Sequence, residues 1–392
     1  MITNRTNDSE KPRTVSAAGK IETIQALRGI AAFVVVLWHA SGLVAPYGTG
    51  FTLHFMPGGA FGVSLFFLIS GFIMVHTTRN CDGSALYCGD FLIRRLARIW
   101  PVYAIATIAL VVIRPPSGIS FAWVFESLTF QPHGAGPAPG FGYPILGVGW
   151  TLNYEIYFYL VFGLSMLFGR ARWWVMGAWF VGSLILLPLV LGRQPSFTPT
   201  TSYDLSVAYL NLISNPINWM FFGGCLFGLL SQVDKLSIKR TAVALALLVL
   251  TTSMVALQWV TGFRTVNGIN GVGLSLIPFF GVVVLSLQSL PTKVPRFLTY
   301  LGDVSYSLYL IHPIVIGSYF GVIRLIDIPI DSNVRYFGFG ATILVSLVIA
   351  SLSHHWIEAN LSRRVQRLLR QVVLGGRVPL SRNGRVAKEA LT

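Results

Sequence analysis

The stretch IQALRGIAAFVVVLWHA, residues 24–40, is a long apolar segment that contains one arginine and one histidine. A helix that crosses a bilayer needs about 20 mostly apolar residues, and residues 24–44 meet this requirement. Arg28 and His39 are eleven residues apart, so at about 100° and about 1.5 Å per residue they lie on the same helix face, roughly 16 Å apart along the axis. Because ionisable side chains are costly inside a membrane, this face is a candidate functional site.

The rest of the chain has the same membrane-like composition. Of its 392 residues, 54% are hydrophobic and only 11% are charged. Hydropathy predicts an all-α, polytopic integral membrane protein with about ten transmembrane helices. The predicted spans are residues 24–44, 58–77, 93–113, 146–168, 173–191, 213–231, 241–260, 268–288, 303–323 and 337–357.

The distribution of positive charge predicts how the chain is oriented. With ten spans, 24 of the 29 Lys and Arg residues fall on the side that holds both termini. Positively charged loops are retained in the cytoplasm, so both termini are predicted to be cytoplasmic. The predicted organisation is a polar cytoplasmic N-terminal tail (1–20), a membrane domain (21–360) and a basic cytoplasmic C-terminal tail (361–392). The C-terminal tail begins as a basic amphipathic helix, which is typical of a membrane-surface anchor.

Charge and motif content narrow the function classes. Most of the net charge of +15 lies on the side facing anionic membrane lipids, so no nucleic-acid partner is needed to explain it. The three cysteines lack zinc-site spacing, and the chain has no HExxH, P-loop or GxSxG motif, so no metal is predicted. The glycine pairs Gly58/Gly62 and Gly224/Gly228 have the spacing of close helix packing.

Two further ionisable residues lie within predicted spans. Glu155 occurs in GWTLNYEIYFYL, and His312 occurs in LGDVSYSLYLIHPIV, at a similar membrane depth. Together with His39 they place two histidines and a carboxylate near mid-membrane on three different spans, where they meet if these helices pack together. A lone buried histidine often serves packing only, and Glu155 is equally suited to be a counter-ion. A catalytic histidine, however, also needs a partner that sets its orientation and basicity.

A cluster of arginines marks the cytoplasmic end of the third predicted span. RRLARIWPVY contains Arg94, Arg95 and Arg98, and Arg28 lies at the same level. Such residues commonly anchor topology, but guanidinium groups also match phosphate oxygens, so a phosphate clamp is the functional alternative. Arginines at the inner face with a histidine and a carboxylate deeper in the membrane suit an enzyme that uses a phosphate-bearing donor. They equally suit a transporter of an anionic solute.

Five segments, taken in order, resemble the signature segments of acyltransferase family three, the membrane O-acyltransferases that modify bacterial surface glycans. They are the first span with its Arg28 to His39 spacing, GAFGVSLFFLISGFIM, RRLARIWPVY, GWTLNYEIYFYL and LGDVSYSLYLIHPIV. The start IQALRGIAA is most similar to the ExoZ-type exopolysaccharide-production branch of this family. Any one of these segments is short and apolar, but five in sequence are specific.

The resemblance implies transfer of an acyl group, usually acetyl from acetyl-CoA, to a hydroxyl of an extracytoplasmic glycan such as exopolysaccharide, in the bacterial inner membrane. By matching motif positions, it implies catalytic roles for His39, Glu155 and His312. It likewise implies donor-binding roles for Arg28, Arg95 and Arg98. The rival hypothesis from another class is a transporter or flippase for an acidic sugar or lipid-linked glycan intermediate, which would use the same histidine and carboxylate for proton coupling.

Two positions depart from the family pattern, and one connection is unusual. Gln25 stands where many relatives carry Asp, which removes a possible partner for Arg28, whereas Thr151 replaces Ser and keeps the hydroxyl. The connection 114–144 is rich in Pro and Gly and is either an interfacial segment or a surface on which sugar rings stack. Its aromatic residues are Trp123, Phe125, Phe130, Phe141 and Tyr143.

Overall fold

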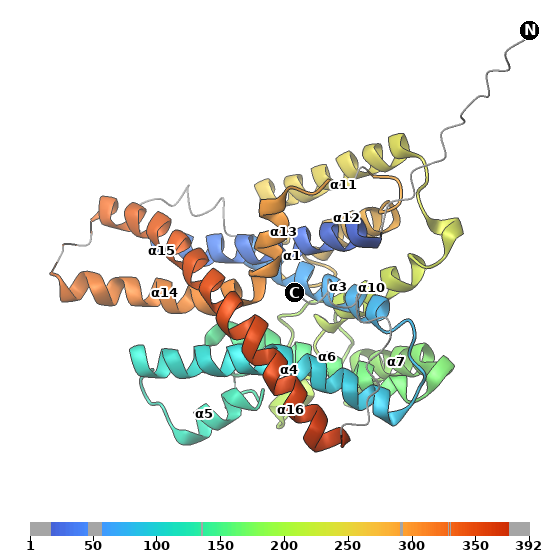
Figure 1. Ribbon diagram of the computed structural model, residues 1–392, viewed down its shortest axis with the longest axis horizontal. Helices are drawn as coiled ribbons and strands as arrows, with labels where there is room; N and C mark the ends of the chain where they lie inside the picture. The colour runs from blue at the N-terminus through green and yellow to red at the C-terminus, as the bar shows by residue number, and fades with distance from the viewer. Residues whose placement is uncertain are drawn as a thin grey trace, which may run out of the picture.

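The computed structural model describes residues 17–45, 57–134, 136–290, 293–327, 329 and 331–375, and within them every regular element is a helix (Figure 1). Seven helices of this described part are long and apolar enough to cross a membrane. They are α1 (Ala17–Ser41), α3 (Gly58–Thr77), α4 (Ala85–Ile113), the combined helix Gly169–Val190, α11 (Thr241–Thr261), α14 (Ser305–Leu325) and the combined helix Ser332–Leu374.

Both combined helices contain a π-helical segment. The first consists of η2 (Gly169–Ala171), α7 (Arg172–Val181), the π-helix η3 (Gly182–Leu186) and α8 (Leu187–Val190). The second consists of α15 (Ser332–Ser353), the π-helix η5 (His354–Leu361) and α16 (Ser362–Leu374). Short elements complete the described chain: α5 (Phe121–Leu128), η1 (Gly147–Gly149), α9 (Ala208–Ile213), η4 (Asp234–Leu236) and α13 (Arg296–Asp303).

The other three predicted spans form shorter helices, so the count of ten crossings is not established by helix length. They are α6 (Trp150–Met166), with 17 residues, and α10 (Asn218–Leu230) and α12 (Gly273–Leu285), with 13 residues each. The start of α10 shows how a short helix is tolerated within the fold. The fully buried Asn218 donates from Nδ2 to the carbonyls of Leu212, at 3.0 Å, and Asn215, at 3.1 Å. Irregular backbone at membrane depth requires such internal partners.

Helix α3 lies at the centre and packs against α1 and α10. A Cβ atom at Gly224 of α10 would lie 2.0 Å from the carbonyl oxygen of Leu68 in α3. On the opposite side, a Cβ atom at Gly62 would lie 2.5 Å from the carbonyl oxygen of Ala31 in α1. Only glycine permits backbones to approach this closely, so the predicted packing role of the glycine pairs is confirmed.

The structure describes part of each predicted terminal tail. Residues 1–16 of the predicted N-terminal tail lie outside the described residues, and α1 begins at Ala17. In the predicted C-terminal tail, α16 continues the long helix across α4 (Figure 1), and residues 376–392 lie outside the described part. The buried carboxylate of Asp90 in α4 pairs with Arg94 of the same helix and with Arg370 of α16. This ion-pair network holds α16 against α4.

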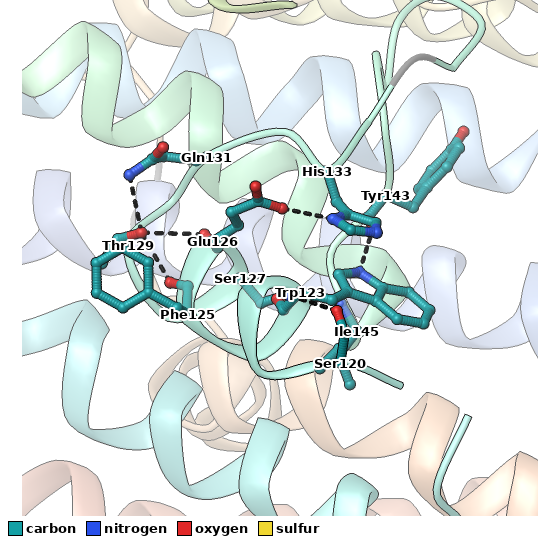
Figure 2. A network of polar contacts seen from close by, with 10 residues as sticks. All are labelled: Ser120, Trp123, Phe125, Glu126, Ser127, Thr129, Gln131, His133, Tyr143 and Ile145. Carbon is teal, nitrogen blue, oxygen red and sulfur yellow. Dashed lines mark hydrogen bonds and ion pairs between the residues drawn. The ribbon is translucent and has the colours of Figure 1, made fainter. Parts of the chain in front are cut away.

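The connection between α4 and α6 is a folded unit built around α5 (Figure 2). The rings of Trp123 and His133 stack, with centroids 5.0 Å apart and an interplanar angle of 16°. His133 Nδ1 pairs with the carboxylate of Glu126, and Trp123 Nε1 donates to the Tyr143 carbonyl at 3.1 Å. Ser127 Oγ accepts from the backbone N–H of Ile145 at 3.0 Å. Sequence reasoning assigned no role to His133, which the structure places inside this network.

The aromatic residues of this connection divide into two groups. Phe130 and Phe141 are buried, and the ring of Phe130 stacks on that of Tyr103 in α4 at 5.3 Å between centroids. Their burial gives them a packing role, so they are removed from the residues that could stack on a sugar ring. Phe125 and Tyr143 remain exposed.

Candidate active site

Helices α1 and α14 bring the two predicted histidines into direct contact. His39 Nδ1 lies 3.2 Å from His312 Nε2, and the ring centroids are 4.8 Å apart. His312 is fully buried, whereas His39 is half-buried. The sequence placed both residues at a similar depth on different spans, and the structure shows that the two spans pack so that these residues meet.

The hydrogen bonds of the pair determine where its protons lie. His39 Nδ1 is 3.0 Å from the carbonyl of Val35, and His312 Nδ1 is 3.1 Å from the carbonyl of Leu308. A carbonyl oxygen only accepts, so each Nδ1 carries the hydrogen in the neutral rings, and each Nε2 keeps its lone pair. The Nδ1–H of His39 is then shared between Val35 and the Nε2 lone pair of His312. This arrangement leaves His39 Nε2 available as a base.

Glu155 does not join the histidine pair. Its carboxylate accepts hydrogen bonds from the hydroxyl of Tyr159, one turn later on α6, and from Ser70 Oγ of α3 at 3.3 Å. The sequence suggested that Glu155 orients His39. Among the described contacts, that position is occupied by His312 and the Val35 carbonyl instead.

The predicted arginines lie with Glu155 around one cavity. Arg28 donates to Ser305 Oγ at 3.2 Å, and the buried Arg95 donates to Thr77 Oγ1 at 3.2 Å. The guanidinium of Arg95 also lies 5.7 Å from the centroid of the Tyr159 ring, within the range of a cation–π contact. The ionisable residues that line the cavity are Arg28, Arg95, Arg98, Glu155, Tyr159, Tyr306 and Tyr309.

The charge of this cavity suits an anion. Three guanidinium groups face it and are opposed by a single carboxylate among the described lining residues. Guanidinium groups bind phosphate oxygens through paired hydrogen bonds. The Nε atom of Arg95 is buried without a hydrogen-bond partner in the described part of the chain, which leaves one donor for a bound group. The arrangement therefore favours the phosphate-clamp hypothesis over simple topology anchoring.

Tyr309 connects the arginine cavity with the histidine pair. Its side chain lines the cavity, and its ring centroid lies 6.0 Å from that of His312. Its hydroxyl is 2.9 Å from Thr151 Oγ1 and donates to the carbonyl of Val148 at 2.9 Å. Sequence reasoning gave Tyr309 no role, although its position three residues before His312 places both on neighbouring parts of one helix face. Thr151 keeps the hydroxyl of a serine at this position, and Tyr309 is its partner.

The departure at Gln25 is also explained. The Gln25 amide donates to the carboxylate of Asp303 at the end of α13, while Arg28 takes Ser305 as its partner. A carboxylate at position 25 would face Asp303 directly, so the amide suits this neighbour. Sequence reasoning missed Asp303 and Ser305, although both lie in the segment that contains His312.

A family model described as an acyltransferase domain matches residues 21–352. The chain belongs to acyltransferase family three. The resemblance drawn from the five sequence segments is therefore confirmed, and the protein is a multi-pass membrane acyltransferase that transfers groups other than aminoacyl groups.

Three curated proteins illustrate the relatives of this acyltransferase. It is 32% identical over 278 residues to exopolysaccharide production protein ExoZ of Rhizobium meliloti (strain 1021), which covers 68% of this chain and 79% of ExoZ. It is 27% identical to nodulation protein 10 of Rhizobium leguminosarum bv. viciae, over 65% of this chain and 71% of that protein. It is 26% identical to acyltransferase MdmB of Streptomyces mycarofaciens, over 78% of this chain and 80% of that protein. No solved structure matches the acyltransferase.

Proposed function

We propose that this acyltransferase moves an acetyl group from acetyl-CoA to a hydroxyl of an extracytoplasmic glycan of the exopolysaccharide class, in the bacterial inner membrane. The observation that carries the proposal is the cavity with three arginines, which Tyr309 joins to the hydrogen-bonded pair of His39 and His312. The glycan class is supported by the similarity to a relative named for exopolysaccharide production.

The proposal includes ten membrane crossings with both termini in the cytoplasm. One further cavity is lined by residues at helix ends that the charge distribution assigns to the cytoplasm. They include Gln25, Arg79, Ser231 and Gln288. Because these helix ends meet at one cavity, the structure supports spans that alternate in direction as predicted.

The donor would lie along α1. Acyl-CoA carries its phosphates at one end and its thioester at the end of a long flexible arm. Arg28, Arg95 and Arg98 would hold the phosphates, and the arm would extend past Tyr309 toward His39. The rise from Arg28 to His39 is roughly 16 Å, a distance that requires such an extended donor.

His39 would act as general base. Its Nε2 takes the proton of the glycan hydroxyl while the oxygen attacks the thioester carbonyl, and the tetrahedral intermediate then expels the CoA thiolate, which takes the proton back from His39. When His39 is protonated, its Nδ1–H donates to His312 Nε2, which stabilises the imidazolium. General-base catalysis of this kind contributes about 10²- to 10⁴-fold. In the alternative mechanism, Nε2 attacks the thioester carbonyl first and expels the CoA thiolate, which forms an acyl-histidine. The glycan hydroxyl then attacks the acyl carbonyl, the C–N bond breaks, and the hydroxyl proton passes to the released Nε2.

Base-labile ester on the surface polysaccharide of the native host tests the proposal. Wild type, a deletion strain, and the deletion strain complemented with wild type or His39→Ala at equal protein levels are compared. We expect the deletion to lose ester, wild type to restore it and His39→Ala to fail. If ester content is unchanged while polysaccharide export falls, the transporter hypothesis replaces this one.

Purified protein with radiolabelled acetyl-CoA and de-esterified polysaccharide gives the direct assay. The acyl-histidine mechanism predicts that label remains on the protein when acceptor is omitted. This label should be absent from His39→Ala. Label found only on the polysaccharide would support direct transfer.

A further inference from the structure

A second cavity opens beside the arginine cavity, among helix ends that lie far apart in the sequence. Its polar lining comes from α1, the end of α3, α4 and the ends of α10 and α12. The residues that matter for its chemistry are Arg28, His76, Arg79, Arg98, Ser237 and Gln288. Arg28 and Arg98 line both cavities, so the two cavities adjoin at these side chains.

The second cavity is lined by positive charge. Arg28, Arg79 and Arg98 face it, and no Asp or Glu is among the described residues that line it. None of these arginines forms an ion pair with another described residue. Arg79 is exposed, so its guanidinium is free to reorient toward a ligand. This surplus of guanidinium groups favours a ligand with more than one phosphate.

The remaining walls suit a purine nucleoside. The rings of Phe72 and His76 lie one turn apart on α3, nearly parallel at 18°, with centroids 6.0 Å apart. They form an aromatic side of the cavity, against which a flat base can pack. On the α12 side, Gln288 offers an amide that both donates and accepts hydrogen bonds, and Ser237 offers a hydroxyl. Phosphate-binding cations beside an aromatic wall and an amide are the groups that a phosphorylated nucleoside needs.

We propose that the second cavity binds the 3′-phosphoadenosine end of the donor, with Arg79 contacting the 3′-phosphate. Arg28 and Arg98, at the junction, contact the pyrophosphate together with Arg95 of the first cavity, and the arm then extends toward Tyr309. This assignment rests on the proposed function, because it takes the donor to be acyl-CoA. It adds a nucleotide subsite that the sequence motifs did not identify.

The test compares acetyl-CoA with 3′-dephospho-acetyl-CoA, using full-length protein in phosphatidylcholine nanodiscs. We expect wild type to have a KM for acetyl-CoA about 10- to 100-fold below that for the dephospho donor, the range of a charge-assisted hydrogen bond. Arg79→Gln should raise the KM for acetyl-CoA by a similar factor and leave the KM for the dephospho donor and both kcat values unchanged. Arg170→Gln, an exposed arginine of η2 outside both cavities, is the matched control and should change neither KM.

An equal rise of both KM values in Arg79→Gln, or no rise in either, would overturn the proposal. A lipid headgroup is the other source of phosphate at this site. If phosphatidylglycerol in the nanodisc alters the KM and the 3′-phosphate does not, the cavity binds a headgroup and the proposal is wrong.

Calorimetric binding of adenosine 3′,5′-bisphosphate separates this subsite from the proposed function. Wild type should bind it at least tenfold more tightly than Arg79→Gln, whether or not acetyl-CoA is turned over. If the protein binds the bisphosphate but does not turn over acetyl-CoA, the proposed acetyl transfer is wrong and the subsite stands. If it turns over acetyl-CoA but does not bind the bisphosphate, the subsite is wrong and the proposed function stands.

Discussion

The contact between the two histidines leads to a double-mutant prediction. His39 and His312 should act as one unit, because the Nδ1–H of His39 is shared between the Val35 carbonyl, at 3.0 Å, and His312 Nε2, at 3.2 Å. Replacing His312 with Ala leaves the Val35 bond and the tautomer of His39 in place. It removes the acceptor that, in the proposed mechanism, stabilises His39 when its ring becomes charged.

The size of the effect follows from that single bond. A hydrogen bond to a charged group contributes about 1.5–3 kcal/mol, and about 1.36 kcal/mol corresponds to a tenfold change in rate. We therefore expect His312→Ala to lower kcat by about 10- to 100-fold and to leave the KM for acetyl-CoA unchanged. His39→Ala, which removes the base itself, should lower kcat by about 10²- to 10⁴-fold. The double variant should be no slower than His39→Ala alone.

The assay is acetyl transfer from labelled acetyl-CoA at saturating donor, with purified proteins at equal concentration. Since His312 is fully buried, its truncation also leaves a cavity, so His312→Gln is included as a variant of closer volume whose amide oxygen can accept the hydrogen bond. Recovery of kcat in His312→Gln would support positioning of His39. If the double variant loses the product of the two single effects, the histidines act independently and the reasoning is refuted.

Three further predictions concern packing and charge. Gly224→Ala should lower the thermal unfolding temperature in detergent by an amount that corresponds to about 1–3 kcal/mol, because its Cβ would meet a backbone carbonyl of α3. The control Gly223→Ala should be tolerated, because its Cβ makes an ordinary side-chain contact. Asp90→Ala should destabilise the protein by roughly 3 kcal/mol and expose α16 to trypsin, because it leaves two arginines unpaired. Arg370→Met should destabilise the protein less, and equal effects of the two variants would contradict this account. Glu155→Gln should lower the KM for acetyl-CoA about two- to fivefold, because it removes the one carboxylate among the described residues that line the arginine cavity. A raised KM would argue against binding of donor phosphates in this cavity.

Sequence periodicity and hydropathy predicted the long helices well. The predicted span 58–77 coincides with α3 (Gly58–Thr77), and the predicted span 241–260 ends one residue before α11 (Thr241–Thr261). The shorter helices were overextended because hydropathy does not distinguish apolar helix from apolar loop. The predicted span 213–231 includes Pro216, and α10 begins only at Asn218, whose side-chain amide donates to the carbonyl of Leu212 in α9.

For the candidate site, the sequence singled out individual residues but not the contacts between them. His39, His312 and Glu155 stood out because ionisable groups are rare in apolar spans. Which of them meet depends on how each helix is rotated about its axis, and that is decided by close packing along entire interfaces. The hydroxyl groups of Tyr309 and Ser305 were missed because tyrosine and serine are ordinary in membrane helices, where they commonly bond to nearby backbone. Only the structure shows that the Ser305 hydroxyl accepts from Arg28 and that the ring of Tyr309 contacts His312.

The partition between the two halves of the site has a chemical consequence. A continuous open path from the arginines to His39 would admit water to the thioester and protons to a buried base. Tyr309 lies between the cavity that it lines and the ring of His312, and its hydroxyl is held by contacts with Thr151 and Val148. In the proposed function, the arm of the donor therefore displaces Tyr309 or passes beside its ring. On that proposal, the arginines select the donor by the charge of its phosphates, and Tyr309 selects by shape the acyl group that reaches His39.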